Sequence, residues 1–299
     1  MMPAATRDAI AAAQKNRGTI FVEDGVLLTT ERFEGAQFIQ RLRAPRCAAA
    51  AQPGSFVHVS CADALPMRRP LSIMRSEDDW IEILFKNVGN GLRALSKKQA
   101  GDIVSILGPI GKGFSPDPAH PLCLMIGGGV GIPPMIFLAD KLRNDARFRP
   151  YAILGSELPF PFALVRSELD FPGVSKTTSS AMPLLENWGI ASRLTSLAGF
   201  AGCHRGYVTE LADQWLHGLD PEQLKSVKIF SCGPTPMLKA VAELAARYNV
   251  ACEVSLEEFM ACAVGGCAGC VVRVTTDDGP AMKRVCVDGP VFDAGTVAW

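Results

Sequence analysis

Four cysteines near the C-terminal end of the chain have a spacing that could hold a metal cluster. The stretch CAVGGCAGC places Cys262, Cys267 and Cys270 within nine residues, and Cys286 follows after fifteen intervening residues. This C-x4-C-x2-C…C spacing is that of a plant-type [2Fe–2S] site. Four thiolates must then converge on two irons, and the glycines and alanines between them leave backbone N–H groups free to point at sulfur. The pattern favours a [2Fe–2S] cluster held by these four thiols.

Zinc, disulfides and a reactive thiol are the alternatives. A structural zinc site usually takes its ligands as two short-spaced pairs, whereas here three cysteines lie together and one is distant. The chain begins without the apolar core of a secretory signal, so we expect a cytoplasmic, reducing location in which disulfides are rare. Lone cysteines in apolar settings are usually small buried side chains. The scattered ones are Cys47, Cys61, Cys123, Cys203, Cys232 and Cys252.

A glycine-rich turn, GGGVGIPP, occupies residues 127–134 after the apolar run LCLMI. Glycines let a backbone approach a pyrophosphate closely, and the N–H groups of a following helix can bind the anion. Ile132 stands where the pattern G-x-G-x-x-G has its last glycine, so a tight turn without a ligand is the alternative.

A second turn, SCGPTPM at 231–237, also follows a strand-like run and opens a helical one. Because ligands of a doubly wound sheet bind at the carboxyl ends of its strands, we expect the two turns to line one crevice. Cys232 could be a nucleophile, but no histidine lies near it in sequence. We therefore interpret it as a small side chain that leaves room for a flat ring.

The segment MRRPLSIM, residues 67–74, places Arg69 three residues before Ser72. On an extended chain this brings a charged phosphate donor and a hydroxyl close together. An edge strand whose arginine faces solvent is the alternative.

The elements that would position these residues fall into three regions. Short β-rich runs at 19–30, 55–60, 80–89 and 102–111 predict a small antiparallel barrel. After the linker SPDPAHP, strand-like LCLMI, YAILGS and VKIFSCG alternate with helix-like segments, one of them opened by Thr209. This alternation predicts a parallel, doubly wound sheet. The cysteine region carries few helical signals.

Charge and hydropathy exclude some classes of function. Lys and Arg balance Asp and Glu at 30 each, so no basic excess favours nucleic acid or an anionic membrane surface. The uncharged segment 122–139 contains glycines and prolines that oppose a membrane span. The four histidines, His58, His120, His204 and His217, show no ligand spacing, and we expect them on the surface or in loops.

The order Arg-Pro-Leu-Ser, Gly-Asn-Gly-Leu, GPIGKGF, GGGVGIPP and CGPTPM resembles the ferredoxin–NADP reductase superfamily. With SLEEFMAC before the cysteines and VCVDGPVF after them, the chain is similar to the electron-transfer subunits of dihydroorotate dehydrogenase type B, from Thr19 to Phe292. The resemblance implies an FAD-binding antiparallel barrel, a doubly wound NAD(P)-binding domain and a small [2Fe–2S] domain. The expected boundaries are an N-terminal extension at 1–17 and domains at 18–116, 117–254 and 255–299.

The resemblance also implies site residues. FAD would contact Arg69, Pro70, Leu71, Ser72, Leu84, Phe85, Lys86, Gly91 and Leu92. The nicotinamide nucleotide would contact Gly127, Gly128, Gly129, Gly131, Cys232, Gly233 and Pro234. Two positions depart from the family pattern. Leu92 replaces a usual Thr and loses a hydroxyl, and Ala263 replaces a usual Gly and would strain the loop if its φ is positive.

Such a subunit has no residues for dihydroorotate chemistry and no catalytic side chain. It implies an FMN-containing dihydroorotate dehydrogenase catalytic subunit as partner, expected in a heterotetramer. Glu157 after the second strand favours NAD over NADP, whereas Arg166 argues the reverse. The alternatives are a stand-alone or diaphorase-type NAD(P)H-dependent flavin or ferredoxin reductase, and a non-enzymatic redox-sensing iron–sulfur protein.

Overall fold

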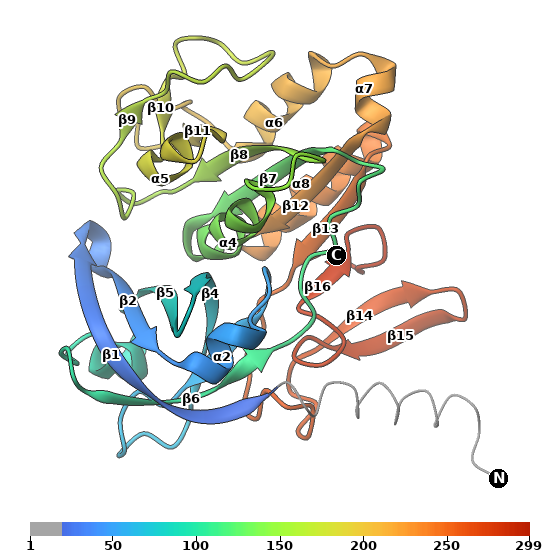
Figure 1. Cartoon of the computed structure of the whole chain (residues 1–299). Helices are drawn as coiled ribbons and strands as arrows, with labels where there is room; N and C mark the ends of the chain where they lie inside the picture. The colour runs from blue at the N-terminus through green and yellow to red at the C-terminus, as the bar shows by residue number, and fades with distance from the viewer. Residues whose placement is uncertain (1–19) are drawn as a thin grey trace.

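The computed structural model describes residues 20–299, which form a closed barrel, a six-stranded sheet and two small hairpins (Figure 1). The expected N-terminal extension at 1–17 lies outside the described residues. The predicted fold class, an antiparallel barrel followed by an α/β region and a small C-terminal region, is confirmed.

The barrel is antiparallel, with strand order β1-β2-β5-β4-β3-β6. Leu27, Leu42, Ile73 and Ile83 are fully buried inside it, which is why these sequences alternate between apolar and polar residues. Its elements are β1 (Phe21–Phe33), η1 (Glu34–Ala36), β2 (Gln37–Arg43), α2 (Pro45–Ala50), β3 (Phe56–Val59), β4 (Arg69–Glu77), β5 (Trp80–Lys86), α3 (Gly89–Leu95) and β6 (Ile103–Ile110).

The second sheet has the order β11-β8-β7-β12-β13-β16, in which the first five strands are parallel. Helix α4 covers one face, and α6 and α8 cover the other (Figure 1). The elements are β7 (Leu122–Gly128), η2 (Gly129–Gly131), α4 (Ile132–Leu142), β8 (Arg149–Gly155), β9 (Val165–Arg166), β10 (Ser180–Ala181), α5 (Pro183–Asn187), β11 (Ala191–Thr195), α6 (Val208–His217), α7 (Pro221–Lys225), β12 (Val227–Cys232), α8 (Thr235–Tyr248) and β13 (Ala251–Ser255).

The chain order of the parallel strands reverses between β7 and β12. In such sheets a crevice opens at the carboxyl ends of the two strands where the order reverses. The turns GGGVG and SCGP follow these two strands. The topology therefore places both predicted turns at one switch point.

The C-terminal region leaves the sheet after β13 and returns to it. It contains the hairpin β14 (Val271–Thr276) and β15 (Gly279–Arg284), and then β16 (Val291–Asp293), which pairs antiparallel with β13. The backbone N–H of Lys112 donates to the carbonyl of Gly289 over 2.6 Å, so this region also contacts the end of the barrel.

The barrel and the sheet are joined through α4. Phe137 on this helix is fully buried in the same apolar cluster as the barrel residues Ile73 and Phe85. A second set of contacts fixes the linker between the barrel and the sheet. Lys228 forms a largely buried ion pair with Glu253 at 2.8 Å, and both side chains also bond the backbone of Ser115.

Two expectations for single residues are wrong. Thr209 does not open α6, because the N-cap is Tyr207, which makes no side-chain capping bond. His58 is neither on the surface nor in a loop: it lies in β3 and is 1% exposed. Burial and then the charge of Arg68 lower the pKa of His58 to about 4, so its ring is neutral.

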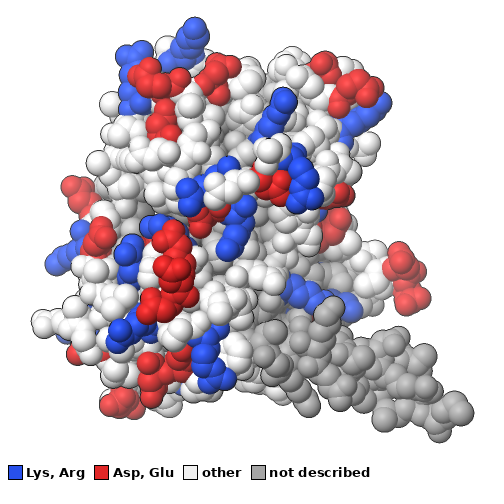
Figure 2. Space-filling model, viewed as in Figure 1, with Lys and Arg blue, Asp and Glu red and all other residues white. Residues whose placement is uncertain are grey.

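The visible face of the molecule carries basic and acidic side chains side by side (Figure 2). Among the helices of the described residues, none has the length and apolar character that crossing a bilayer would need.

We predict that Phe137→Ala lowers the free energy of unfolding by about 3–5 kcal/mol, because it leaves a cavity where α4 enters the barrel core. Urea unfolding followed by circular dichroism measures the change. The control is Tyr207→Ala, whose side chain is 61% exposed and whose removal should cost less than about 0.5 kcal/mol. Equal losses in the two variants would contradict the anchoring role of Phe137.

Candidate functional site

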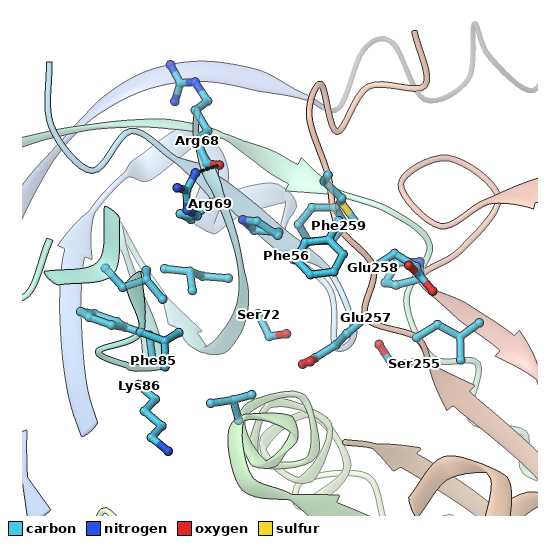
Figure 3. Close-up of a pocket in the computed structure, with 18 of the residues that line it drawn as sticks. Phe56, Arg68, Arg69, Ser72, Phe85, Lys86, Ser255, Glu257, Glu258 and Phe259 are labelled. Carbon is cyan, nitrogen blue, oxygen red and sulfur yellow. Dashed lines mark hydrogen bonds between the residues drawn. The ribbon is translucent and has the colours of Figure 1, made fainter. Parts of the chain in front are cut away.

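A cavity of about 1040 Å³ lies where the barrel, the sheet and the C-terminal region meet (Figure 3). Its volume is at the upper end of ordinary ligand pockets, which hold about 300–1,000 Å³. Of the residues predicted to contact FAD, those that line it are Arg69, Pro70, Leu71, Ser72, Leu84, Phe85, Lys86 and Leu92. The paired strands β4 and β5 thus bring segments 69–72 and 84–86 to one wall.

Arg69 and Arg68 are adjacent in sequence but differ in their partners, and Figure 3 shows the bond from Arg69 to the Arg68 carbonyl. The guanidinium of Arg68 donates to the carbonyls of His58 and Ser105, at 3.1 and 2.7 Å, and to the Ser105 hydroxyl. The guanidinium of Arg69 donates through Nη1 alone, to the carbonyls of Met67 and Arg68. Both arginines line the cavity, but Arg69 keeps Nε and Nη2 free of hydrogen bonds to the other described residues, whereas the Arg68 guanidinium bonds the barrel.

Gly91 and Leu92 do not form a simple turn, because they lie in the short helix α3. A side chain at Gly91 would come within 3.0 Å of Arg69 Nε, so the absence of a Cβ lets the guanidinium lie against the helix backbone. Gly91 itself does not line the cavity, whereas Leu92 does. The two segments expected to contact FAD are thus neighbours in space.

The two glycine turns meet at the switch point of the sheet. A Cβ on Gly131 would lie 2.2 Å from the carbonyl oxygen of Cys232 and 2.5 Å from the nitrogen of Gly233. A Cβ on Gly233 would likewise approach the nitrogen of Gly128, at 3.3 Å. This backbone contact is possible only with glycine at Gly131, which explains the residue type there without invoking a ligand.

Other residues of these turns face the cavity. Val130 and Thr235 line it, whereas Gly127, Gly128, Gly129, Gly131, Cys232, Gly233 and Pro234 do not. The nucleotide turns thus border the cavity at its edge. Cys232 is fully buried at the end of β12, and burial raises the pKa of its thiol far above its usual range. A neutral, enclosed thiol is a poor nucleophile, which agrees with a purely space-filling side chain.

The four predicted cluster cysteines are arranged as two pairs. The sulfurs of Cys270 and Cys286 lie 3.3 Å apart, and the backbone N–H of Cys267 lies 3.4 Å from the sulfur of Cys262. Nowhere in residues 20–299 do three His, Cys, Asp or Glu side chains surround one point suited to a single metal ion. Two pairs of thiols fit a cluster of two irons, each of which takes two cysteines.

Backbone N–H groups of the loop point at these sulfurs. Burial alone would raise the pKa of Cys262, but the N–H groups of Val264, Cys267 and Gly266 outweigh it and lower the pKa to about 7. Burial, followed by the neighbouring Cys270, raises the pKa of Cys286 to about 12. N–H donors of this kind stabilise thiolate ligands of a metal.

The concern about Ala263 is justified by its backbone. Ala263 has φ 56° and Ala268 has φ 52°, both in the left-handed region. An L-residue other than glycine pays about 1–2 kcal/mol there. The loop therefore holds its conformation against local strain at two positions next to Cys262 and Cys267.

Residues from the end of β13 to the cysteine loop also line the cavity, and the sequence analysis used this stretch only for the family resemblance and assigned it no contact. They are Ser255, Leu256, Glu257, Glu258, Phe259, Met260 and Ala261. The carboxyl group of Glu257 points into the cavity toward Ser72 (Figure 3). Solvent reaches it through the cavity, but protein atoms crowd its other sides, and this burial raises its pKa. An acidic pair directly before the cysteine motif was the available signal.

Comparison with known proteins gives matches over most of the chain. Residues 257–298 match the iron–sulfur cluster binding domain of dihydroorotate dehydrogenase B. The electron-transfer subunit of dihydroorotate dehydrogenase B (NAD(+)) from Caldanaerobacter subterraneus is 34% identical, over 82% of this chain and 86% of the relative. The subunit of the same name from Geobacillus kaustophilus is 35% identical over the same shares.

Solved structures show the same fold. An NADH-dependent reduced ferredoxin–NADP oxidoreductase superimposes with a TM-score of 0.73 at 24% identity, over 92% of this chain and 90% of the other. A ferredoxin NADP+ reductase from Neisseria gonorrhoeae gives a TM-score of 0.56 at 16% identity, over 77% of this chain and 92% of the other.

We predict that Gly131→Ala destabilises the fold by about 1–3 kcal/mol, because the new methyl group meets backbone atoms of the neighbouring turn. Gly128→Ala is the matched control in the same turn: its methyl group meets first the flexible side chain of Met237, at 2.5 Å from the sulfur. Thermal unfolding compares the variants. If Gly128→Ala is the more damaging of the two, the close contact between the turns is not the constraint we describe.

Proposed function

This chain belongs to the family of electron-transfer subunits of dihydroorotate dehydrogenase B, and on that premise we propose that it exchanges electrons between NAD(H), FAD and a [2Fe–2S] cluster. We propose further that its partner is an FMN-containing catalytic subunit that holds the dihydroorotate chemistry, in a heterotetramer. With dihydroorotate as donor, the electrons would end on NAD+.

One observation carries the proposal: a single cavity borders all three regions of the chain. Its wall includes Ser72 of the barrel, Val130 and Thr235 of the nucleotide turns, and Gly269 of the cysteine loop. A flavin can take a hydride from a nicotinamide and give up electrons singly, so its place is between a two-electron and a one-electron partner. A cavity that borders all three regions supports this position for the flavin.

The residues of this chain act by binding and orienting. In the proposed arrangement Arg69, with Gly91 behind it, receives the phosphates of FAD, and Ser72 and Lys86 meet its ring system. Glycine turns at 127–131 and 232–234 receive the nicotinamide nucleotide. Cys262, Cys267, Cys270 and Cys286 hold the cluster. We assign no nucleophile and no general acid or base for dihydroorotate.

NAD is the proposed nucleotide. Glu157 is exposed directly after β8, at the edge of the sheet where the adenosine ribose of such cofactors binds, and a carboxylate there disfavours a 2′-phosphate. Arg166, the residue that argued for NADP, lies in β9, which pairs with β10 and not with the main sheet.

Exposed apolar residues around the cysteine loop support a protein partner. Val264 in the loop and Val271 and Met282 on the hairpin are exposed large hydrophobic residues. Exposed apolar residues gathered on one part of a surface are typical of protein–protein contacts. Their place beside the cysteines suits a partner that must come close to the cluster.

Anaerobic purification of the native complex tests the proposal directly. We expect FAD, iron and sulfide to be bound to this chain and FMN to be bound to a co-eluting subunit. FAD and cluster without an FMN-bearing partner would favour a stand-alone reductase, and a cluster without flavin would favour a redox sensor.

We predict that Arg69→Ala weakens FAD binding about 10- to 150-fold, since a hydrogen bond to a charged group contributes about 1.5–3 kcal/mol. Fluorescence titration of flavin-free protein measures the change. Arg68→Ala is the neighbouring control. Because the Arg68 guanidinium bonds the barrel, it should lower thermal stability and leave FAD affinity within about threefold, a difference of less than about 1 kcal/mol. A larger loss of FAD affinity in the control would reverse the two roles.

We predict that Cys267→Ser abolishes the cluster while NADH still reduces bound FAD. The hydroxyl cannot replace the thiolate that the cluster needs, whereas the flavin wall of the cavity is untouched. Iron analysis and stopped-flow absorbance are the measurements. Cys203→Ser, a partly exposed thiol outside the loop, should change neither. A normal iron content in Cys267→Ser would refute the ligand assignment.

A further inference from the structure

Arg284 links the cysteine loop to the C-terminal hairpin. It is the last residue of β15 and lies opposite Val271, the residue after Cys270. Its Nη1 donates to the carbonyl of Gly265, in the middle of the loop, over 3.2 Å. The guanidinium therefore connects the loop that carries three cysteines to the strand that leads to the fourth, Cys286.

The contact with Arg284 requires glycine at position 265. Its φ is +81°, and a Cβ would come within 2.6 Å of Val287 and 3.2 Å of Arg284 Nη1. Its carbonyl accepts from Arg284, which stands two residues before Cys286. The guanidinium thus ties the middle of the loop to the backbone next to the fourth cysteine.

The carboxylate of Asp288 compensates part of the charge of Arg284. Asp288 accepts the backbone N–H of Arg284 at 2.8 Å, but its carboxylate lies 3.6 Å from Nε, beyond a good hydrogen bond. A second arginine of the hairpin, Arg273, is exposed, and its side chain makes no hydrogen bond or ion pair with the other described residues. The two arginines carry equal charges on the same hairpin, and the contact with the loop distinguishes them.

We propose that Arg284 is a positioning residue for the [2Fe–2S] cluster, which holds the loop closed through Gly265 and makes the reduction potential of the cluster more positive. The inference rests on the proposed function, since it requires the cluster. Four thiolates and two sulfides outweigh the charge of two irons, and reduction adds one more negative charge. A fixed positive charge in a partly buried position favours the reduced form.

An EPR-monitored redox titration of the purified protein tests this. We expect Arg284→Gln to lower the ratio of reduced to oxidised cluster about tenfold at a fixed potential, which for one electron is a shift of about 59 mV to more negative values. Arg284→Lys keeps the charge and should recover most of the shift. Arg273→Gln removes the same charge away from the loop and should leave the potential unchanged, apart from a small effect that salt screens.

Asp288→Asn keeps the proposal testable if Arg284→Gln does not assemble a cluster. Removing this carboxylate leaves Arg284 uncompensated, so we expect a shift to more positive values, opposite in sign to that of Arg284→Gln. Iron and sulfide per chain are measured for each variant. A wild-type chain without iron and sulfide would contradict the proposed function. An assembled cluster whose reduction potential is unchanged by Arg284→Gln would contradict only the role of Arg284. If Arg284→Gln does not assemble a cluster, an unchanged potential in Asp288→Asn would do the same.

Discussion

Packing of helix α4 against the barrel is the interaction on which the candidate site depends. The helix begins at the nucleotide turn that follows β7, and its Phe137 is buried in the barrel core beside residues of β4 and β5. Strand β4 starts with Arg69 and Ser72. One helix therefore fixes the distance between the turn expected to hold a nicotinamide and the strand expected to hold a flavin, with no contribution from a flexible linker.

The C-terminal region is also held by a few contacts. It is anchored at its start by β13, at its end by β16, and in between by the bond from Lys112 to Gly289. Its cysteine loop adds its own constraints, since Ala263 and Ala268 adopt left-handed conformations and Arg284 bonds Gly265. These contacts fix the backbone on both sides of the cysteines.

The sequence predicted much of this architecture, because its strongest signals are local. Apolar runs ending in glycine turns predicted the strands on both sides of the switch point, and cysteine spacing predicted a [2Fe–2S] cluster in the region that matches an iron–sulfur cluster binding domain. The failures concern residues whose environment is set by distant segments. His58 is buried because both faces of β3 are covered, and Glu257 faces the cavity because the chain crosses it on the way to the cysteines. Neither fact has a signature in neighbouring residues. The sequence analysis did not predict the short helix α3. Two of its first three residues are glycines, which are poor helix formers, and its seven residues are too few to show a helical periodicity.

The pairing of β13 with β16 has a consequence for how this chain is assembled from parts. Ser255 and Val291 are partners in that ladder, so the segment between them leaves the sheet and returns to it at neighbouring points. A segment whose ends lie together can be exchanged for a short connection without disturbing the strands that flank it. The cysteine region is thus built as an insert: a scaffold of this kind can gain or lose the whole region as one unit, while the crevice proposed for the nicotinamide nucleotide keeps its geometry.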